Sequence, residues 1–509
     1  MAERVQLMAR LTAPELLDLV VDAGTWESWD TPPIQVAADS EYADELLRAQ
    51  EKTGLDEAVL TGVATIRGRR TAILVCEFGF LGGSIGVAAG ERLVAAIRRA
   101  TRERLPLLAL PTSGGTRMQE GTTAFLQMVK ITAAAIKHKE AHLPYLVYLR
   151  SPTTGGVFAS WGSLGHVTIA EPGALVGFLG PRVFEALYES PFPAGVQTAE
   201  NLHAHGLIDA VRPPDQLAEI VDRALRIITS GRGGRPSLAD APVHESLPDV
   251  PAWDSVVASR REDRPGVREV MFHSASDVLP LNGTGQGEVD PGLILALVRF
   301  GDMPCVLLGQ DRRGQTTRSP LGPGALREAR RGMRLAAELN LPLVTVIDTA
   351  GAALSKEAEE GGLAGEIARC IADMVSLDVP TVSLLLGQGT GGGALALIPA
   401  DRVLAAQHGW LSPLPPEGAS AILHHDIAHA PDMAARQGIR SSDLLASGIV
   451  DEMIPELPDA ADESTAFCTR VGAVLHRELS LLDAADTTQR LSDRAERFDR
   501  IGLLQPAHA

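Results

Sequence analysis

Short apolar runs alternate with amphipathic segments along most of the chain. In the first half, β-type runs occupy 71–77, 105–110 and 144–149, and helix-type segments occupy 90–104 and 122–140. Strands that alternate with helices of this length are typical of an α/β fold built on a parallel sheet. The pattern therefore predicts an α/β fold for this half.

The same alternation returns in the second half. Strands are expected at 304–309, 343–347 and 379–386, and helices near 325–338 and 357–376. Between the halves, 230–251 is rich in Gly, Pro, Ser and Asp and has little periodicity, which indicates a linker. We therefore expect an N-terminal domain at 1–229, a linker at 230–251 and a C-terminal domain at 252–509.

Three separated landmarks indicate that the halves are copies of one fold. The run LPLLAL at 105–110 is echoed 236 positions later by LPLVTV at 341–346, and Gly155-Gly156 is echoed 237 positions later by Gly392-Gly393. HGLID at 205–209 is echoed by SGIVD at 447–451. A near-constant offset over three landmarks predicts an internal duplication with one site element in each copy.

Each half carries two glycine loops between a predicted strand and a predicted helix. The first half has them at 113–120 and 153–157, and the second half at 348–352 and 391–394. Glycine lets the backbone approach a ligand closely, and two N–H groups aimed at one oxygen form an oxyanion hole. The alternative is that these glycines only permit tight turns and close packing.

Composition excludes several classes of function. A net charge of −18 disfavours nucleic acid and anionic lipid as partners, since both need a basic face. The four cysteines lie far apart and form no zinc or redox spacing, so no metal site is expected. The uncharged stretches 152–170 and 381–400 are broken by glycine pairs, and the N-terminus has no apolar signal core. We therefore expect a cytoplasmic protein without a membrane span.

Two motifs favour other functions. Gly387–Gly392 satisfies a dinucleotide fingerprint, but the acidic residue expected about 20 positions later is missing. The segment Gly82-Gly83-Ser84-Ile85-Gly86 fits a nucleophile elbow, which leaves a serine hydrolase open. Such an enzyme would also need a histidine and an acid that the sequence does not place.

At these same loops the sequence resembles the carboxyltransferase of acetyl-CoA carboxylase, with a β-type half in front of an α-type half. The segments that carry the resemblance are 82–86, 113–120, 152–157, 171–183, 347–352, 391–396 and 416–423. The four-cysteine zinc ribbon of many β subunits is absent. Ala350 replaces the usual proline of the α-type loop, and 313–317 follows the α pattern only loosely.

The resemblance implies two tandem crotonase-like spiral domains of ββα units, with CoA in the first and biotin in the second. It also implies a homo-oligomer whose active sites lie between halves of different chains. Carboxybiotin, held by a biotinylated carrier protein and loaded by a separate biotin carboxylase, would carboxylate acetyl-CoA to malonyl-CoA for fatty acid synthesis. A propionyl-CoA carboxyltransferase and a decarboxylase of malonyl-type thioesters remain alternatives.

The resemblance also assigns site residues. Both reactants develop an oxyanion, which explains duplicated backbone donors without a dedicated side-chain base. The expected catalytic residues are Gly155 and Gly156 for the acyl-CoA enolate and Gly392, Gly393 and Ala394 for biotin. The expected cofactor-binding residues are Gly114, Gly115, Gly351 and Ala396, and the small Ala396 is similar to the acetyl-using type.

Overall fold

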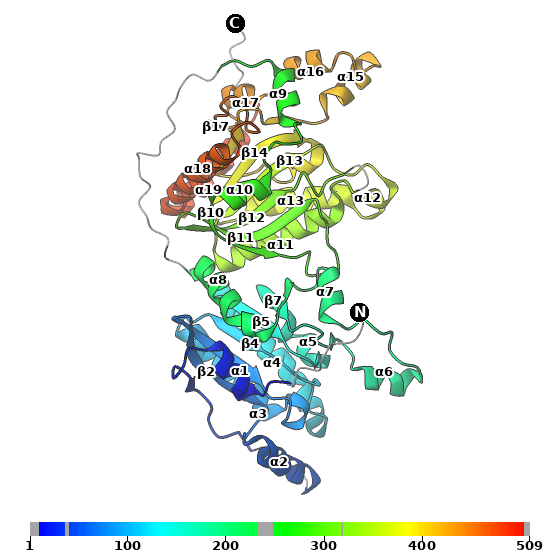
Figure 1. The fold of residues 1–509 in the computed structure, drawn as a ribbon, viewed down its shortest axis with the longest axis vertical. Helices are drawn as coiled ribbons and strands as arrows, with labels where there is room; N and C mark the ends of the chain where they lie inside the picture. Colours follow the sequence, from blue (N-terminus) through cyan, green and yellow to red (C-terminus); the bar gives the residue numbers. More distant parts are fainter. Residues whose placement is uncertain (1–9, 36–39, 230, 232–247, 317–318, 503–509) are drawn as a thin grey trace. The chain divides into compact units, whose positions relative to one another are not determined.

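The computed structural model describes residues 10–35, 40–229, 231, 248–316 and 319–502, which divide into two compact units. The first unit is Met1–Arg226 and the second is Ile227–Ala509. Of the predicted linker at 230–251, residues 230 and 232–247 lie outside the described residues. Each unit is built around its own sheet (Figure 1).

The described part of the first unit forms a seven-stranded sheet of order β1-β2-β3-β4-β5-β7-β9. β1, β2 and β3 pair antiparallel, whereas β3, β4, β5, β7 and β9 run parallel. A separate pair, β6 and β8, lies off this sheet. The strands are β1 (Glu27–Ser28), β2 (Val59–Ile66), β3 (Arg69–Cys76), β4 (Leu107–Leu110), β5 (Tyr145–Leu149), β6 (Thr153–Thr154), β7 (Val167–Ala170), β8 (Val176–Gly177) and β9 (Ala210–Val211).

Helices connect the parallel strands of this unit. The α-helices are α1 (Ala13–Val20), α2 (Ser40–Thr53), α3 (Val87–Arg102), α4 (Gly121–Glu140), α5 (Gly155–Phe158), α6 (Pro181–Tyr188), α7 (Ala199–Ala204) and α8 (Leu217–Thr229). Short 3₁₀ turns are η1 (Leu81–Gly83), η2 (Met118–Glu120), η3 (Trp161–Ser163) and η4 (Pro214–Gln216).

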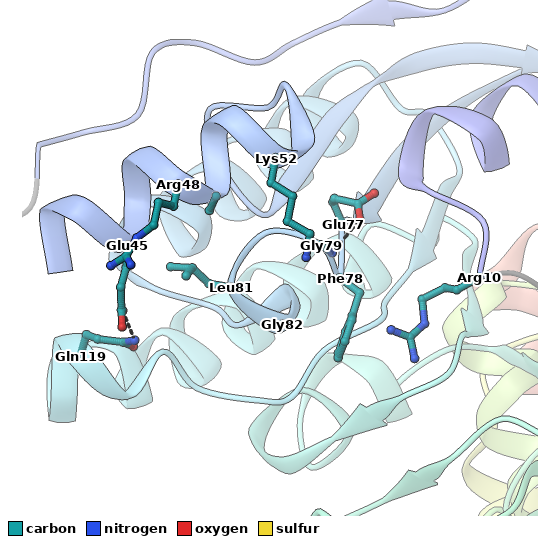
Figure 2. A pocket seen from close by; sticks show the side chains of 11 residues that line it. Arg10, Glu45, Arg48, Lys52, Glu77, Phe78, Gly79, Leu81, Gly82 and Gln119 are labelled. Atoms are coloured by element: carbon teal, nitrogen blue, oxygen red, sulfur yellow. Dashed lines mark hydrogen bonds between the residues drawn. The ribbon is translucent and has the colours of Figure 1, made fainter. Parts of the chain in front are cut away.

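Helix α2 packs on the loop that follows β3. Its buried Ala49 belongs to a small apolar cluster with Ala58 and Phe80, and Leu81 packs against that cluster. The side chains of Glu45, Arg48 and Lys52 on α2 lie along the same loop (Figure 2). The loop from Glu77 to Gly82 is thus covered by a helix from earlier in the chain.

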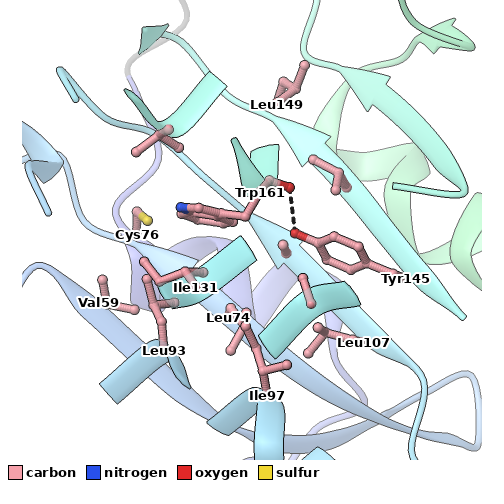
Figure 3. Packing of buried hydrophobic residues seen from close by; sticks show 14 of the residues in the cluster. Val59, Leu74, Cys76, Leu93, Ile97, Leu107, Ile131, Tyr145, Leu149 and Trp161 are labelled. Carbon is pink, nitrogen blue, oxygen red and sulfur yellow. Dashed lines mark hydrogen bonds between the residues drawn. The ribbon is translucent and has the colours of Figure 1, made fainter. Parts of the chain in front are cut away.

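The main core of the first unit lies between its sheet and the helices α3 and α4. All four side chains of β4 are buried, as expected for a central parallel strand covered on both faces. Trp161 and Tyr145 are the bulkiest side chains drawn in this core, and the Tyr145 hydroxyl donates to the Trp161 carbonyl at 2.7 Å (Figure 3). The pairing satisfies a polar group that burial would otherwise leave without a partner.

The described part of the second unit forms an eight-stranded sheet of order β10-β11-β12-β13-β14-β15-β17, with β16 paired to the end of β14. Its first three strands are antiparallel and the others parallel, as in the first unit. The strands are β10 (Ala275–Leu281), β11 (Leu293–Phe300), β12 (Met303–Gln310), β13 (Leu343–Thr349), β14 (Thr381–Thr390), β15 (Arg402–Ala406), β16 (Trp410–Ser412) and β17 (Glu452–Ile454).

Helices also connect the parallel strands of the second unit. They are α9 (Ala252–Ser259), α10 (Val267–Ser274), α11 (Pro323–Leu339), α12 (Lys356–Glu360), α13 (Leu363–Ser376), α14 (Gly391–Leu395), α15 (Pro416–His424), α16 (Ala430–Arg436), α17 (Ser441–Ala446), α18 (Ser464–Ala484) and α19 (Thr487–Asp499). In both units an antiparallel hairpin leads into a long helix, β2-β3-α3 in one and β11-β12-α11 in the other.

Matching hydrogen bonds confirm the predicted duplication. The amide of Leu107 donates to the Pro144 carbonyl at 2.8 Å, and that of Leu343 donates to Pro380 at 2.8 Å. The Asp209 carboxylate accepts from the Thr168 amide at 2.8 Å, while the Asp451 carboxylate accepts from the equivalent Val403 amide at 2.7 Å. Two landmarks that look alike in sequence therefore perform the same structural task in each copy.

One predicted helix is wrong. The segment 357–376 forms two helices, α12 and α13, which are separated by Gly361 and Gly362. Gly362 has a φ of +79°, a left-handed conformation that no α-helix continues through. The apolar periodicity runs across this break, so the pattern alone could not reveal it.

Candidate functional site

Two glycine corners of the first unit meet backbone to backbone. Gly115 lies in the loop after β4 and has a φ of +111°, while Gly155 begins α5 with a φ of +62°. A Cβ atom built on Gly155 would lie 3.3 Å from the Cα of Gly115, and one built on Gly115 would lie 3.4 Å from the Cα of Gly155. Both positions therefore require glycine for conformation as well as for space.

Most N–H groups of these corners already have acceptors. Gly114 donates to the Gly82 carbonyl at 2.9 Å, Gly115 to the Ser113 hydroxyl at 2.9 Å, and Gly155 to the Phe178 carbonyl at 2.9 Å. These donors shape the loops and are not available to a ligand. Three of the predicted site residues, Gly114, Gly115 and Gly155, thus fix the shape of the loops and do not donate to a ligand.

Two neighbouring backbone amides remain available to a ligand. In the part of the chain that the structure describes, the N–H groups of Thr116 and Gly156 have no acceptor. A Cβ built on Gly115 would lie 3.5 Å from the Gly156 nitrogen, and one built on Gly156 would lie 3.4 Å from the Thr116 Oγ1. Thr116 and Gly156 are therefore adjacent and form the candidate donor pair of the first unit. Thr116 was not among the predicted site residues.

The second unit repeats this arrangement. Gly351 donates to the Thr349 hydroxyl at 3.1 Å, as Gly115 does to Ser113, and Gly391 begins α14 with a φ of +62°, as Gly155 begins α5. Among the described residues, the N–H groups of Ala352 and Gly392 have no acceptor. Ala352 and Gly392 are the candidate donor pair of the second unit.

The first residues of α5 and α14 correct one predicted equivalence. The glycines that begin the two short helices with equal φ are Gly155 and Gly391, which are 236 positions apart, so Gly156 corresponds to Gly392. The pairing of Gly155-Gly156 with Gly392-Gly393 at an offset of 237 is wrong by one residue. Three consecutive glycines at 391–393 let the sequence comparison shift by one position.

The other residues predicted on the biotin side lie deeper. Gly393 is buried, and a Cβ there would lie 2.9 Å from Leu321 Cδ2. The side chains of Ala394 and Ala396 are 0% exposed. Ala396 therefore packs inside the unit, and its small side chain reaches no surface of the chain.

A buried glutamine orients the second glycine turn. The Gln310 side chain is fully buried at the end of β12, and its Nε2 donates to the Gly393 carbonyl at 2.7 Å. Its Oε1 accepts from the Asp348 amide at 3.1 Å. Gln310 thus links β13 to the turn that carries Gly392. A glutamine at the end of an otherwise apolar strand was the sequence signal that could have found it.

Asp348 is also buried, directly before the Gly351 loop. Its Oδ1 accepts from the Gln388 amide at 3.1 Å, and its Oδ2 lies 3.6 Å from the Arg312 guanidinium. Burial raises the pKa of the Asp348 carboxyl, while the charges of Arg312 and Arg264 act in the opposite direction.

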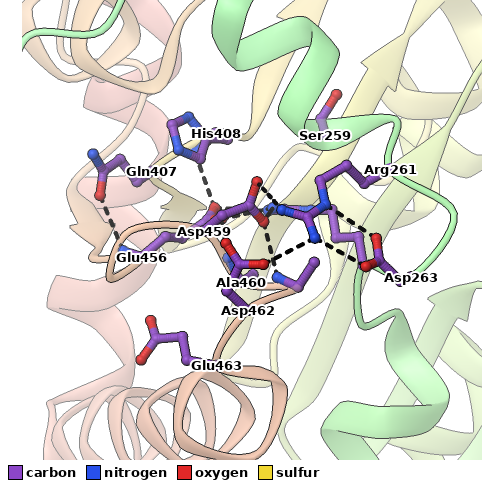
Figure 4. A network of polar contacts seen from close by, with 12 residues as sticks. Ser259, Arg261, Asp263, Gln407, His408, Glu456, Asp459, Ala460, Asp462 and Glu463 are labelled. Carbon is purple, nitrogen blue, oxygen red and sulfur yellow. Dashed lines mark hydrogen bonds and ion pairs between the residues drawn. The ribbon is translucent and has the colours of Figure 1, made fainter.

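An ion pair holds β14 before it reaches the glycine turn. Arg264 donates to the Leu386 carbonyl at 2.9 Å and to the Glu456 carboxylate at 2.6 Å, and both charged side chains are 0% exposed. Glu456 also accepts from the His408 amide at 3.0 Å, and its own amide donates to Gln407 at 3.0 Å (Figure 4). Removing either partner of such a buried pair costs about 3–5 kcal/mol.

A different ion pair fixes the loop between β3 and α3 in the first unit. Arg117 is buried, donates to the Glu57 carboxylate, and donates through Nη2 to the Ser84 carbonyl at 2.8 Å. Burial lowers the pKa of Arg117, but Glu57 more than offsets this, so the net pKa is raised. The only described side-chain partner of the Ser84 hydroxyl is Arg117 Nε, at 3.4 Å. No described histidine contacts Ser84, which disfavours the serine hydrolase.

The described residues contain neither a cluster for a metal ion nor a helix that could span a membrane. No group of three or more His, Cys, Asp or Glu side chains is arranged to hold a metal ion. No helix within the described ranges is both long and apolar enough to cross a membrane.

Comparisons with known proteins agree with this geometry. A family model described as the carboxyl transferase domain matches residues 8–489. The probable biotin-dependent acyl-coenzyme A carboxylase beta3 subunit of Mycobacterium tuberculosis (strain ATCC 25618 / H37Rv) is 61% identical over 497 residues, covering 97% of this chain and 99% of its own. The acetyl-coenzyme A carboxylase carboxyl transferase subunits beta/alpha of Parafrankia sp. (strain EAN1pec) are 38% identical over 535 residues, covering 98% of this chain and 87% of their own.

A solved structure supports the fold. The hexameric transcarboxylase 12S superimposes with a TM-score of 0.73 at 20% sequence identity, covering 94% of this chain and 91% of its own. The predicted pair of tandem crotonase-like domains is confirmed by this likeness together with the family match.

Proposed function

Because the chain belongs to the carboxyl transferase family and is a biotin-dependent acyl-CoA carboxyltransferase, we propose that it converts acetyl-CoA to malonyl-CoA for fatty acid synthesis. One observation carries the proposal: each unit holds two backbone N–H groups, one in a glycine loop and one at the start of a short helix, for which no acceptor is found among the described residues. A reaction with two developing oxyanions needs two such pairs.

The first pair serves the acyl-CoA thioester. When the biotin that has released its carboxyl group takes the α-proton, negative charge would develop on the thioester oxygen, and the N–H groups of Thr116 and Gly156 would donate to it. Loss of one such donor typically raises the barrier by about 3 kcal/mol. These donors are fixed before reaction by the contact between Gly115 and Gly155, so no reorganisation is needed at the moment of proton transfer.

The second pair serves biotin. Carboxybiotin on a carrier protein would supply the carboxyl group, and the carbonyl oxygen of its ureido group would become more negative as that group departs. The N–H groups of Ala352 and Gly392 donate to that oxygen, and Gln310 holds the Gly392 turn in place. Both donor sets are backbone groups, whose chemistry is independent of pH over the physiological range.

The surroundings of Gly156 support a short acyl chain. A Cβ built on Gly156 would lie 3.1 Å from Met128 Cγ and 3.4 Å from Thr116 Oγ1. Met128 is buried and holds its place in the core. The space beside the first donor pair is therefore limited, which fits acetyl-CoA better than a long-chain thioester.

Exposed apolar side chains near both donor pairs support a homo-oligomer with active sites between copies. In the first unit Phe125 is 59% and Val129 66% exposed on α4, and in the second unit Leu354 is 94% exposed beside the Gly351 loop. Apolar side chains gathered on a surface mark protein contacts. We propose that the first unit of one copy faces the second unit of another.

The test is reconstitution with a biotin carboxylase and a biotinylated carrier protein. With both partners, bicarbonate and ATP, the chain should carboxylate acetyl-CoA with a higher kcat/KM than propionyl-CoA. The chain alone should fix no bicarbonate. A higher kcat/KM for propionyl-CoA would contradict the assignment of acetyl-CoA as the substrate. ATP-dependent carboxylation by the chain alone would contradict the need for a separate biotin carboxylase and carrier protein.

A further inference from the structure

The loop that carries the Ala352 donor is held differently from its counterpart in the first unit. In the first unit the Gly114 amide donates to the Gly82 carbonyl at 2.9 Å, so the backbone between β3 and α3 holds the loop. At the equivalent position of the second unit, the Ala350 amide has no acceptor among the described residues. The second loop therefore depends on other contacts.

Gln315 supplies such contacts from the segment between β12 and α11. Its Nε2 donates to the Asp348 carbonyl at 3.0 Å, and its Oε1 accepts from the Thr349 hydroxyl at 2.6 Å. Its own backbone amide donates to the Asp311 carbonyl at 3.1 Å, and a Cβ built on Gly292 would lie 3.1 Å from its Cγ. The side chain is thus anchored at its base and bonded through both ends of its amide group.

These bonds decide where the Thr349 hydroxyl sends its single hydrogen. A hydroxyl has one hydrogen to donate and two lone pairs that accept. The Gln315 oxygen at 2.6 Å is closer than the Gly351 carbonyl oxygen at 3.3 Å, so the hydrogen goes to Gln315. A lone pair of the hydroxyl then accepts from the Gly351 amide at 3.1 Å. Thr349 is 1% exposed, so little solvent reaches this hydroxyl.

The Gly351 amide directly precedes the donor Ala352. Gly351 has a φ of +130°, in the region that favours glycine, and Ala352 forms an isolated parallel bridge as Thr116 does in the first unit. A Cβ built on Gly393 would lie 3.6 Å from the Ala352 nitrogen, which places that nitrogen beside the second glycine turn. The orientation of Gly351 therefore sets the direction of the Ala352 N–H.

The first unit lacks this side-chain support. Gly115 donates to the Ser113 hydroxyl at 2.9 Å, as Gly351 does to the Thr349 hydroxyl. Within the described ranges, the only acceptor of the Ser113 hydroxyl is the Gly115 carbonyl at 3.3 Å. The contribution of Gln315 is thus specific to the second unit.

We propose that Gln315 is a positioning residue for the biotin side of the reaction. It fixes the Thr349 hydroxyl, which orients Gly351 and thereby aims the Ala352 N–H at the ureido oxygen of biotin. Gln315 acts through Thr349 and touches no substrate itself. The inference rests on the proposed function, since it takes Ala352 to face biotin.

Gln315→Leu tests this role in the reconstituted enzyme. The substitution keeps most of the side-chain bulk and removes both amide bonds, so kcat/KM for the biotinylated carrier should fall about tenfold, the scale of a lost hydrogen bond. KM for acetyl-CoA should stay at the wild-type value. Arg313→Ala is the matched control, because Arg313 belongs to the same segment but is exposed and pairs with Glu269; both parameters should stay unchanged.

A double-mutant cycle shows whether Gln315 acts through Thr349. Thr349→Val removes the hydroxyl, so adding Gln315→Leu should cost little more, and the double variant should match Thr349→Val alone. Thr349→Ser keeps a hydroxyl, as Ser113 does in the first unit, and should recover most of the activity that Thr349→Val loses. Losses from Gln315→Leu and Thr349→Val that multiply in the double variant would overturn the inference.

Hydrogen exchange gives a readout apart from turnover. In Gln315→Leu, a peptide covering 347–353 should exchange faster than in the wild type, whereas a peptide covering 112–117 should not change. Unchanged exchange at 347–353, or an equal loss of acetyl-CoA use, would also overturn the inference. Faster exchange in a protein whose wild type transfers no carboxyl group from biotin would instead reject the proposed function and leave the link from Gln315 to the loop intact.

Discussion

Gln310 shows how one side chain can orient a backbone donor. It is fully buried and bridges the Asp348 amide and the Gly393 carbonyl, so its two ends set the distance between β13 and the glycine turn. The sequence predicted the glycines because their residue type is conspicuous. It could not predict which amides remain free, because the acceptors Gly82 and Phe178 lie far away in sequence.

Gln310→Glu should therefore impair the biotin side selectively. The substitution keeps the acceptor for Asp348 but places a carboxylate oxygen against the Gly393 carbonyl, which removes a buried bond and costs about 1–3 kcal/mol. KM for the biotinylated carrier should rise while KM for acetyl-CoA changes little. Gln407→Glu is the matched control, because Gln407 also accepts a backbone amide in this unit but does not contact the turn.

A substitution at Ser84 distinguishes catalysis by backbone amides from nucleophilic catalysis by a serine. Its hydroxyl has only a weak contact with Arg117 among the described side chains, so Ser84→Ala should retain turnover close to the wild type. A fluorophosphonate probe should not label the wild-type protein. Abolished turnover in Ser84→Ala together with labelling of the wild type would instead support a serine hydrolase.

At the scale of elements, the sequence predicted strands best where both faces are buried, because every residue of such a strand is apolar. The strand at β4 is entirely apolar because both of its faces are covered, and it was expected within two residues of its observed start. The break between α12 and α13 was missed because a left-handed glycine interrupts the backbone without interrupting the apolar periodicity. The short helices α5 and α14 were not predicted as helices, because the sequence indicated glycine loops at these positions.

The end of helix α4 should make the first unit sensitive to acid. His138 is buried, with its ring nitrogens 3.0 Å from the Thr101 hydroxyl and 3.2 Å from the Pro144 carbonyl, and burial lowers its pKa from 6.5 to about 4. The unfolded chain therefore binds a proton between these values that the native chain does not, so stability falls as pH falls through this window.

The expected loss by pH 5 is about 2 kcal/mol. Urea unfolding at pH 7 and pH 5 measures it, and His138→Gln should lack this part of the pH dependence. An identical pH dependence in both proteins would show that His138 is not the responsible group.

At the scale of the whole molecule, duplication explains most of the architecture. Two copies repeat the hairpin, the parallel strands, the aspartate clamps and the glycine turns. The bond from Gln310 to the Gly393 carbonyl belongs to the second copy. The duplication was predictable because three separated segments recur in the second half at a near-constant offset. The exact match between the two glycine turns could not be predicted, because three consecutive glycines can be matched to the first half in more than one way.

The chain should also work without a metal ion. The four cysteines are buried and separate, and no metal-binding cluster exists among the described residues. Dialysis against EDTA and 1,10-phenanthroline should leave reconstituted turnover unchanged, and elemental analysis should find no stoichiometric zinc. Parallel loss of bound zinc and activity would contradict this prediction.

The central claim is that backbone amides stabilise both oxyanions, and a proline–alanine pair at Gly156 tests it most directly. Gly156→Ala keeps the amide and adds a Cβ near Met128, whereas Gly156→Pro adds similar bulk and deletes the amide at a first-turn helix position that tolerates proline. With circular dichroism showing both variants folded, Gly156→Pro should turn over at least about a hundredfold more slowly than Gly156→Ala. Equal turnover in the two variants would contradict the claim.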